Sequence, residues 1–112
     1  STHLGFRPGE RARHLGEIRG VLDRFGEEAV VLAGDVNEPA GGPTWQRLVD
    51  EFIDAGEGDG TATFPARRPR QRIDGVFVRG RASVSAYQVV DDADVRIASD
   101  HRPVVVDVNL GT

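Results

Sequence analysis

The residues with the clearest potential for chemistry are Asp35 and Asn37, which follow a short apolar run at 30–33 and a glycine. The run is typical of a buried strand, which would deliver both side chains to a site at its C-terminal end. Because alternate residues of a strand face the same way, we expect Asp35 and Asn37 to point into one cleft. A carboxylate beside an amide suits a hard cation, a phosphate or an attacking water. The same Gly-Asp-x-Asn spacing also suits a turn without any function.

Further polar residues stand at the ends of other apolar runs: His3, Asp74, Asp100 and His101. Each has an ordinary structural explanation when taken alone, since Asp74 could pair with Arg72 and Asp100 could be a cap or turn residue. Their shared position at strand ends favours a common site instead.

These residues belong to four short motifs, Thr-His, Gly-Asp-x-Asn, Arg-Ile-Asp and Ser-Asp-His, which begin at Thr2, Gly34, Arg72 and Ser99. In this order they resemble the C-terminal half of the endonuclease/exonuclease/phosphatase superfamily, the DNase I-like metal-dependent phosphoesterases. The resemblance covers nearly the whole chain. It implies an α/β (α+β) fold that is half of a four-layer α/β/β/α sandwich, with helices on one face of a mixed β-sheet. Residues 1–112 would form one such domain, without its N-terminal half.

The resemblance also implies hydrolysis of a phosphoester bond, as in a phosphodiesterase, nuclease or phosphatase. Asp35 would orient or deprotonate the attacking water, with Asn37 beside it holding water or phosphate. His101 would contact the phosphate or assist proton transfer, and Asp74 would fix the tautomer of its ring. His3 would donate to a phosphate oxygen as charge develops there.

The implied cofactor is a divalent metal, with Asp100, Asp35 and Asn37 as ligands. The chain has no cysteine, which favours Mg²⁺ or Mn²⁺ over zinc. The glutamate ligand and the early asparagine of the family's first half have no counterpart in these residues, and Gly75 stands where many members have an aromatic residue. The chain alone is therefore expected to be weakly active or inactive. A catalytically inactive binding domain derived from the family is the alternative.

Arginine supplies all the basic side chains, and four arginines lie within six positions: Arg67, Arg68, Arg70 and Arg72. Because a guanidinium can bind phosphate through two hydrogen bonds, we expect Arg70 and Arg72 to bind substrate. A solvated loop is the alternative for the first two. The net charge of −4 and the absence of lysine disfavour a processive nucleic-acid enzyme, although nucleic acid stays among the candidate phosphoester substrates.

The elements that must position these residues follow from hydrophobic periodicity. Apolar residues at three- and four-residue intervals predict helices at 8–25, with Gly26 as its stop, and at 43–54, where Trp45 is expected in the core. Shorter runs predict strands at 1–4, 30–37, 61–65, 72–78, 82–90 and 104–110. In the strand at 82–90, the side chains of Val84, Ala86 and Gln88 are expected to be half-buried. The acidic residues at 91–94 are interpreted as a solvated connector.

With 112 residues, 38% of them hydrophobic and 29% charged, the chain is expected to form one soluble domain of bacterial type. No apolar run approaches the roughly 20 residues of a transmembrane helix, and localisation stays open between cytoplasm and secretion. The lack of methionine and a start just before a motif indicate a piece of a longer protein. Since two helices can cover one sheet face only, we expect a homodimer or association with the missing N-terminal half.

Overall fold

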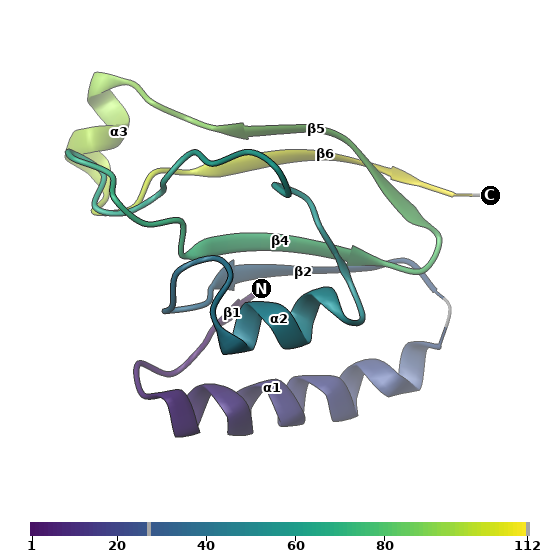
Figure 1. Ribbon diagram of the computed structural model, residues 1–112. Coiled ribbons are helices and arrows are strands. Elements are labelled where there is room, and N and C mark those ends of the chain that lie inside the picture. The colour runs from purple at the N-terminus through teal and green to yellow at the C-terminus, as the bar shows by residue number, and fades with distance from the viewer. Residues whose placement is uncertain (27, 112) are drawn as a thin grey trace.

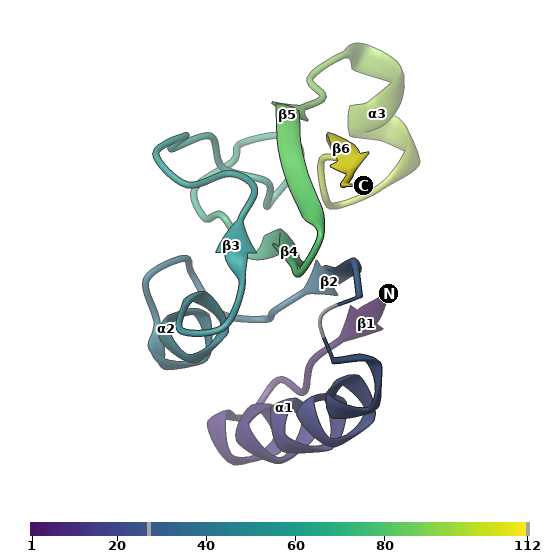
Figure 2. The same ribbon diagram turned by 90° about the vertical axis from the view of Figure 1, so that its right-hand side faces the viewer.

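The computed structural model describes residues 1–26 and 28–111 and arranges them in layers (Figure 1). Helices α1 (Pro8–Leu22) and α2 (Pro43–Val49) form one layer, a four-stranded sheet forms the next, and a two-stranded sheet lies beyond it. Seen from the side, the two helices lie on one face of the larger sheet and the strand pair on the other (Figure 2). The predicted mixed α and β fold, with helices on one face of a mixed sheet, is confirmed; the four-layer sandwich stays a prediction.

The larger sheet brings three strand ends into one row. Its strands, in spatial order, are β1 (Thr2–His3), β2 (Val30–Asp35), β4 (Asp74–Arg79) and β3 (Ile53–Asp54). β1 runs parallel to β2, whereas β4 runs antiparallel to both of its neighbours. The register sets His3 beside Asp35, and Asp35 beside Asp74. Three side chains of the predicted site therefore start from adjacent positions at one end of the sheet.

The helix predicted at 8–25 is confirmed in its extent. It begins at Pro8, and after Leu22 a 3₁₀ turn, η1 (Asp23–Phe25), continues it. Gly26 follows with a φ of 55°, a left-handed conformation that glycine accepts without a steric penalty. The predicted stop is therefore where the helical segment ends.

The second helix is shorter than the predicted range 43–54. It ends at Val49, and Ile53 and Asp54 form β3 by pairing with Val78 and Phe77 of β4. The predicted helix was too long because Phe52 continues the apolar spacing of α2. Phe52 is buried, but it lies in the turn between α2 and β3.

The strand predicted at 61–65 is wrong, because this segment makes only an isolated bridge between Phe64 and Gln71.

The connector predicted at 91–94 is wrong in part. It opens a short helix, α3 (Ala93–Ala98), because the Asp92 carboxylate accepts a hydrogen bond from the Val95 amide at 2.9 Å. Such capping satisfies an amide that the first helical turn leaves without a partner.

The last two strands form a sheet of their own, in which β5 (Ala82–Val89) pairs antiparallel with β6 (Val104–Leu110). The register shifts between Val84 and Ala86, as a β-bulge requires. Because the bulge changes which side chains face inward, the expectation for Ala86 and Gln88 is wrong: both are exposed, while Tyr87 and Val89 are partly buried.

This strand pair lies over part of the sheet face that the sequence suggested would be open (Figures 1 and 2). The cover is incomplete, because Val31, on the face opposite the core residues Val30 and Leu32, still exposes 45% of its surface. A homodimer stays a prediction. Within residues 1–26 and 28–111, no helix is long and apolar enough to cross a membrane.

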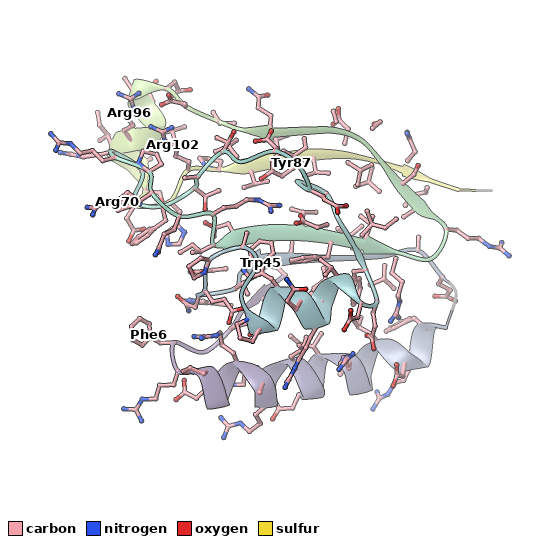
Figure 3. All side chains as sticks on the ribbon, in the orientation of Figure 1. Phe6, Trp45, Arg70, Tyr87, Arg96 and Arg102 are labelled. Carbon is pink, nitrogen blue, oxygen red and sulfur yellow. The ribbon has the colours of Figure 1, made fainter. Side chains whose placement is uncertain are left out.

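The main core lies between the helices and the larger sheet. Its buried side chains are Leu4, Leu15, Val30, Leu32, Val36, Trp45, Leu48, Phe52 and Phe77. Trp45 lies on α2 (Figure 3). It exposes 2% of its surface and packs against Phe77 with ring centroids 5.2 Å apart. Its indole Nε1 donates to the Glu38 carbonyl at 2.8 Å, so the predicted core role of Trp45 is confirmed.

Gly75 is buried beneath this aromatic pair. A Cβ atom added to Gly75 would lie 2.6 Å from a ring carbon of Phe77 and 2.9 Å from one of Trp45. The space that a side chain at position 75 would need is therefore already filled by the core. The glycine is therefore explained by packing on the helix side of the sheet.

Candidate active site

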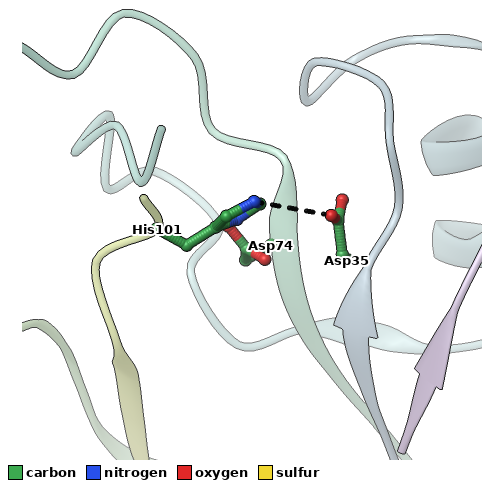
Figure 4. Close-up of side chains that lie close together, drawn as sticks. All are labelled: Asp35, Asp74 and His101. Carbon is green, nitrogen blue, oxygen red and sulfur yellow. Dashed lines mark hydrogen bonds and ion pairs between the residues drawn. The ribbon is translucent and has the colours of Figure 1, made fainter. Parts of the chain in front are cut away.

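Two aspartates and a histidine meet at the end of the larger sheet (Figure 4). Asp35 ends β2, Asp74 begins β4, and His101 comes from the loop before β6. The Nδ1 atom of His101 lies 2.8 Å from Asp74 Oδ2, and its Nε2 atom lies 3.7 Å from Asp35 Oδ2. We call Asp35, Asp74 and His101 the Asp-Asp-His cluster. The fold thus joins three of the motifs that were separate in the sequence.

His3 and Asn37 adjoin this cluster on the side of Asp35. The Nε2 atom of His3 lies 3.4 Å from Asp35 Oδ2, and Asn37 Nδ2 lies 2.9 Å from the same ring nitrogen. Asn37 Nδ2 also donates to the Leu4 carbonyl at 2.6 Å. The ring of His3 is largely exposed, with 71% of its side-chain surface accessible. The structure therefore brings the first predicted motif to the same site.

The route by which Asn37 reaches the site differs from the prediction. The strand ends at Asp35, and Asn37 follows in a turn with a φ of 57°. Asp35 Oδ1 accepts a hydrogen bond from the Asn37 amide at 2.8 Å and so closes that turn. Asparagine tolerates this left-handed conformation better than most residues. The two side chains are neighbours because of a turn, so the argument from strand alternation is wrong.

Two other predicted site residues lie at the margin. Asp100 is 80% exposed in its side chain, and its Oδ1 atom lies 3.9 Å from Nε2 of His101. Arg70 is exposed on the loop that follows Phe64, and its amide donates to the Phe64 carbonyl at 2.9 Å. Figure 3 shows Arg70 at the same end of the molecule as α3. A ligand role for Asp100 and a substrate role for Arg70 stay predictions.

Arg72 is placed elsewhere, which corrects its predicted role in substrate binding. Its guanidinium donates to Asp54 Oδ2 at 2.9 Å and lies 4.9 Å from the ring centroid of Trp45. The Tyr87 hydroxyl is 3.4 Å from its Nε atom. Only 10% of the Arg72 side chain is exposed. Arg72 therefore links α2, β3 and β5, and it leaves Asp74 to pair with His101.

Sequence reasoning missed a buried ion pair that holds the turn of Asn37. Glu38, which is 5% exposed, accepts hydrogen bonds from Arg11 Nε at 3.0 Å and from the amide of Thr44, at the start of α2, at 2.6 Å. Arg11 Nη1 also donates to the Phe6 carbonyl at 2.6 Å and the Asn37 carbonyl at 3.3 Å. The signal for Glu38 was its place shortly before a helix that starts with proline. Nothing in the sequence singled out Arg11.

The environment of His101 favours its charged form. Partial burial acts to lower the pKa of His101, but the hydrogen bond to Asp74 and the negative charges of Asp74, Asp35 and Asp100 outweigh it. The pKa of His101 is therefore raised above its usual value. At neutral pH the cluster holds a larger share of imidazolium than a free histidine would.

This raised pKa predicts a pH dependence of stability in metal-free protein. His101 contributes stability fully at pH values below its unfolded pKa of about 6.5, and the contribution is lost as the pH rises through the higher folded pKa. We expect the free energy of unfolding, measured with urea, to fall as the pH rises from about 6.5 through the raised folded pKa of His101. His101→Asn should flatten this slope, whereas Asp107→Asn, at an exposed carboxylate on β6, should keep it. An equal slope in wild type and His101→Asn would contradict the prediction.

The Asp-Asp-His cluster also has the composition of a metal site. One ligand atom from each of its three residues can be chosen so that all lie within 4.8 Å of one another. An open cavity of about 300 Å³, lined in part by Asp35, Asp74, Ser99 and His101, reaches the cluster. Two carboxylates with open space beside them suit a hard divalent cation that keeps some of its water. The residues present therefore fit the metal that the resemblance implied.

Comparison with known proteins agrees with this geometry. Residues 2–101 match the profile of the Endonuclease/Exonuclease/phosphatase family. The uncharacterized protein YbhP of Escherichia coli is 31% identical over 114 residues, which cover 97% of this chain and 45% of YbhP. The chain thus spans about half the length of the curated relatives that it matches.

Solved structures are similar along almost the whole chain. A mannosyl-6-phosphatase of Bacteroides thetaiotaomicron superposes with a TM-score of 0.74 at 26% identity, over 96% of this chain and 49% of that protein. An endonuclease/exonuclease/phosphatase of Beutenbergia cavernae superposes with a TM-score of 0.71 at 29% identity, over 99% of this chain and 35% of that protein.

Proposed function

Because the chain belongs to the Endonuclease/Exonuclease/phosphatase family, we propose that its Asp-Asp-His cluster takes part in divalent-metal-dependent hydrolysis of a phosphoester. We also propose that residues 1–112 form one domain, equivalent to the C-terminal half of the longer relatives. The observation that carries the proposal is the position of His101 between two carboxylates. One of them binds Nδ1 of the ring, and the other faces Nε2.

The proposed role of His101 follows from how Asp74 holds its ring. Asp74 accepts a hydrogen bond from the Nδ1–H group of the ring, so Nε2 is directed toward Asp35 and the cavity. Since the pKa of His101 is raised, the ring carries a proton on Nε2 in an appreciable fraction of molecules at neutral pH. That N–H can donate to a phosphate oxygen, or pass its proton to a leaving group.

Asp35 is the proposed acceptor for the proton of the attacking water. Its Oδ1 atom is held by the Asn37 amide, and Oδ2 faces His3 and His101. A carboxylate oriented in this way can align a water and take up its proton. Asn37 and His3 lie beside it. The largely exposed His3 is the proposed donor to a phosphate oxygen, while Asn37 Nδ2 already donates to the Leu4 carbonyl.

Mg²⁺ or Mn²⁺ is the proposed cofactor, with Asp35 and Asp74 as the nearest carboxylates and Asp100 and Asn37 at the margin. When bound, the ion would lower the pKa of a water and offset negative charge on the phosphate. The described residues of this chain supply few oxygen ligands, so we expect residues 1–112 alone to bind the ion weakly.

The substrate proposal is a phosphoester, with phosphomonoesters of sugars included because one similar structure is a mannosyl-6-phosphatase. Arg70 is the proposed substrate contact on the loop after Phe64. Net charge of −4 makes a substrate with a single phosphate more suitable than a long polyanion.

The function is tested by hydrolysis of p-nitrophenyl phosphate and bis-p-nitrophenyl phosphate by the metal-stripped, full-length natural protein. We expect turnover of at least one ester after addition of Mg²⁺ or Mn²⁺, and its loss with EDTA. Turnover at an unchanged rate in the presence of EDTA, or no turnover of either ester, would contradict the proposal. Phosphate binding without turnover would favour the inactive binding domain instead.

A further inference from the structure

Thr63 is a fully buried polar residue that the proposed chemistry does not use. Its accessible surface is 0%, yet it lies outside every helix and strand. A buried hydroxyl costs free energy unless it finds partners. Thr63 Oγ1 has two, because it accepts from the amide of Ile73 at 3.2 Å and from the amide of Asp74 at 3.4 Å. The hydroxyl therefore holds the backbone at the start of β4.

The backbone of Thr63 binds two further segments. Its amide donates to the Gln71 carbonyl at 2.9 Å, and its carbonyl accepts from the Arg102 amide at 2.7 Å. The first hydrogen bond again holds the segment just before β4. The second fixes the residue directly after His101. One buried residue thus joins the segment that carries Asp74 to the segment that carries His101.

The residues after Thr63 strengthen the link to His101. The Ala66 amide donates to the Asp100 carbonyl at 2.7 Å, and Arg102 Nε donates to the Ala66 carbonyl at 2.9 Å. The Phe64 ring lies against the His101 ring, with centroids 4.8 Å apart. The residues on both sides of His101 in the sequence, Asp100 and Arg102, are therefore hydrogen-bonded to residues 63–66.

β3 does not reach this part of the sheet. It pairs with β4 only at Phe77 and Val78, so the start of β4 extends beyond the end of its shorter neighbour. Thr63 supplies a side-chain acceptor at that position. Without it, the Asp74 amide would lie at an unpaired sheet edge, and the carboxylate would be less well fixed.

We propose that Thr63 is a positioning residue that sets the hydrogen bond between Asp74 and His101. Its hydroxyl holds Asp74 at the start of β4, while its carbonyl and residues 64–66 hold the loop of His101 against it. Thr63 acts through these two residues and does not touch substrate. The kinetic consequence rests on the proposed function, but the geometric consequence does not.

The test compares Thr63→Val, which removes the hydroxyl at nearly constant volume, with Thr63→Ser, which keeps it. The first readout is the NMR signal of the His101 Nδ1 proton in metal-free protein, because a proton held by Asp74 exchanges slowly with water. We expect this signal in wild type and Thr63→Ser and its loss in Thr63→Val, while the Trp45 indole signal stays in place. A folded Thr63→Val with an unchanged His101 signal would overturn the proposal.

The second readout is steady-state kinetics on whichever phosphoester the protein cleaves. We expect Thr63→Val to lower kcat by about 10- to 100-fold, as loss of outer hydrogen-bond partners does elsewhere, with KM within about twofold. Thr63→Ser should restore most of kcat. An equal loss in both variants would also overturn the proposal. If no phosphoester is cleaved, the proposed function fails, and the NMR comparison still decides the role of Thr63.

If Thr63→Val does not fold, amide hydrogen exchange of the wild-type protein replaces the comparison of the variants. The amides of Ile73, Asp74 and Arg102 are expected to exchange slowly and together, because one residue holds all three. Rapid exchange of these amides in an otherwise protected sheet would show that Thr63 does not hold the site, and would overturn the proposal.

Discussion

Replacing Asp35 by asparagine is expected to lower kcat by about a thousand-fold or more. Asp35 Oδ2 faces both His3 and His101, so this oxygen is where the proposed water would be aligned and lose its proton. An amide at the same place keeps the shape but cannot accept that proton. The measurement is the initial rate of phosphoester hydrolysis at saturating Mg²⁺ or Mn²⁺, together with a melting curve to show that the variant is folded.

Asp107→Asn is the matched control for this change. It removes the same charge from an exposed position on β6 that is not part of the cluster, and it should leave kcat unchanged. Combining Asp35→Asn with His101→Gln should cost little more than the single change, because groups that act as a unit fail together. A folded Asp35→Asn protein with kcat within threefold of wild type would show that Asp35 does not activate the water.

Replacing Trp45 by alanine is expected to lower the free energy of unfolding by about 3–5 kcal/mol. The ring is 2% exposed and packs between Phe77 and the Arg72 guanidinium. Its removal leaves a cavity, and it also leaves the Glu38 carbonyl without the indole donor. Urea denaturation at fixed pH, with equal slopes for the two proteins, measures the difference.

Val49→Ala is the control for Trp45→Ala. Val49 is in the same helix but is 43% exposed, so its truncation should change stability by about 0.5 kcal/mol or less. A loss below about 1.5 kcal/mol for Trp45→Ala would mean that the core relaxes into the space, contrary to the close packing around this ring.

The sequence predicted the members of the site better than their arrangement. Asp35, Asp74 and His101 were found because each stands where an apolar run begins or ends. Their contact depends on the antiparallel register of β2 and β4, which no residue pattern specifies. Asn37 lies beside the cluster, as expected, but a left-handed turn brings it there and not strand alternation.

The errors at Arg72 and at the second helix have one cause. Asp54 was assigned to a helix ending near residue 54, so it was not considered as a partner for Arg72. In the structure Asp54 belongs to β3 beside β4, and its carboxylate meets the guanidinium there. An arginine in a basic stretch resembles a phosphate ligand until its buried acidic partner is known.

The separate sheet of β5 and β6 could not be predicted for a similar reason. An apolar run such as 104–110 shows that a strand is partly buried, but not which sheet contains it. The bulge at Ser85 also reverses the alternation along β5, so a pattern counted from Val84 assigns the second half of that strand to the wrong face.

The contact between Gly75 and Trp45 has a consequence for how this sequence can change over evolutionary time. The Phe77 ring and the indole together fill the space that a side chain at position 75 would need. A larger residue at 75 therefore requires both rings to move or become smaller, and loss of the indole alone leaves a cavity. Positions 45, 75 and 77 are therefore epistatic, because each constrains the substitutions open to the others.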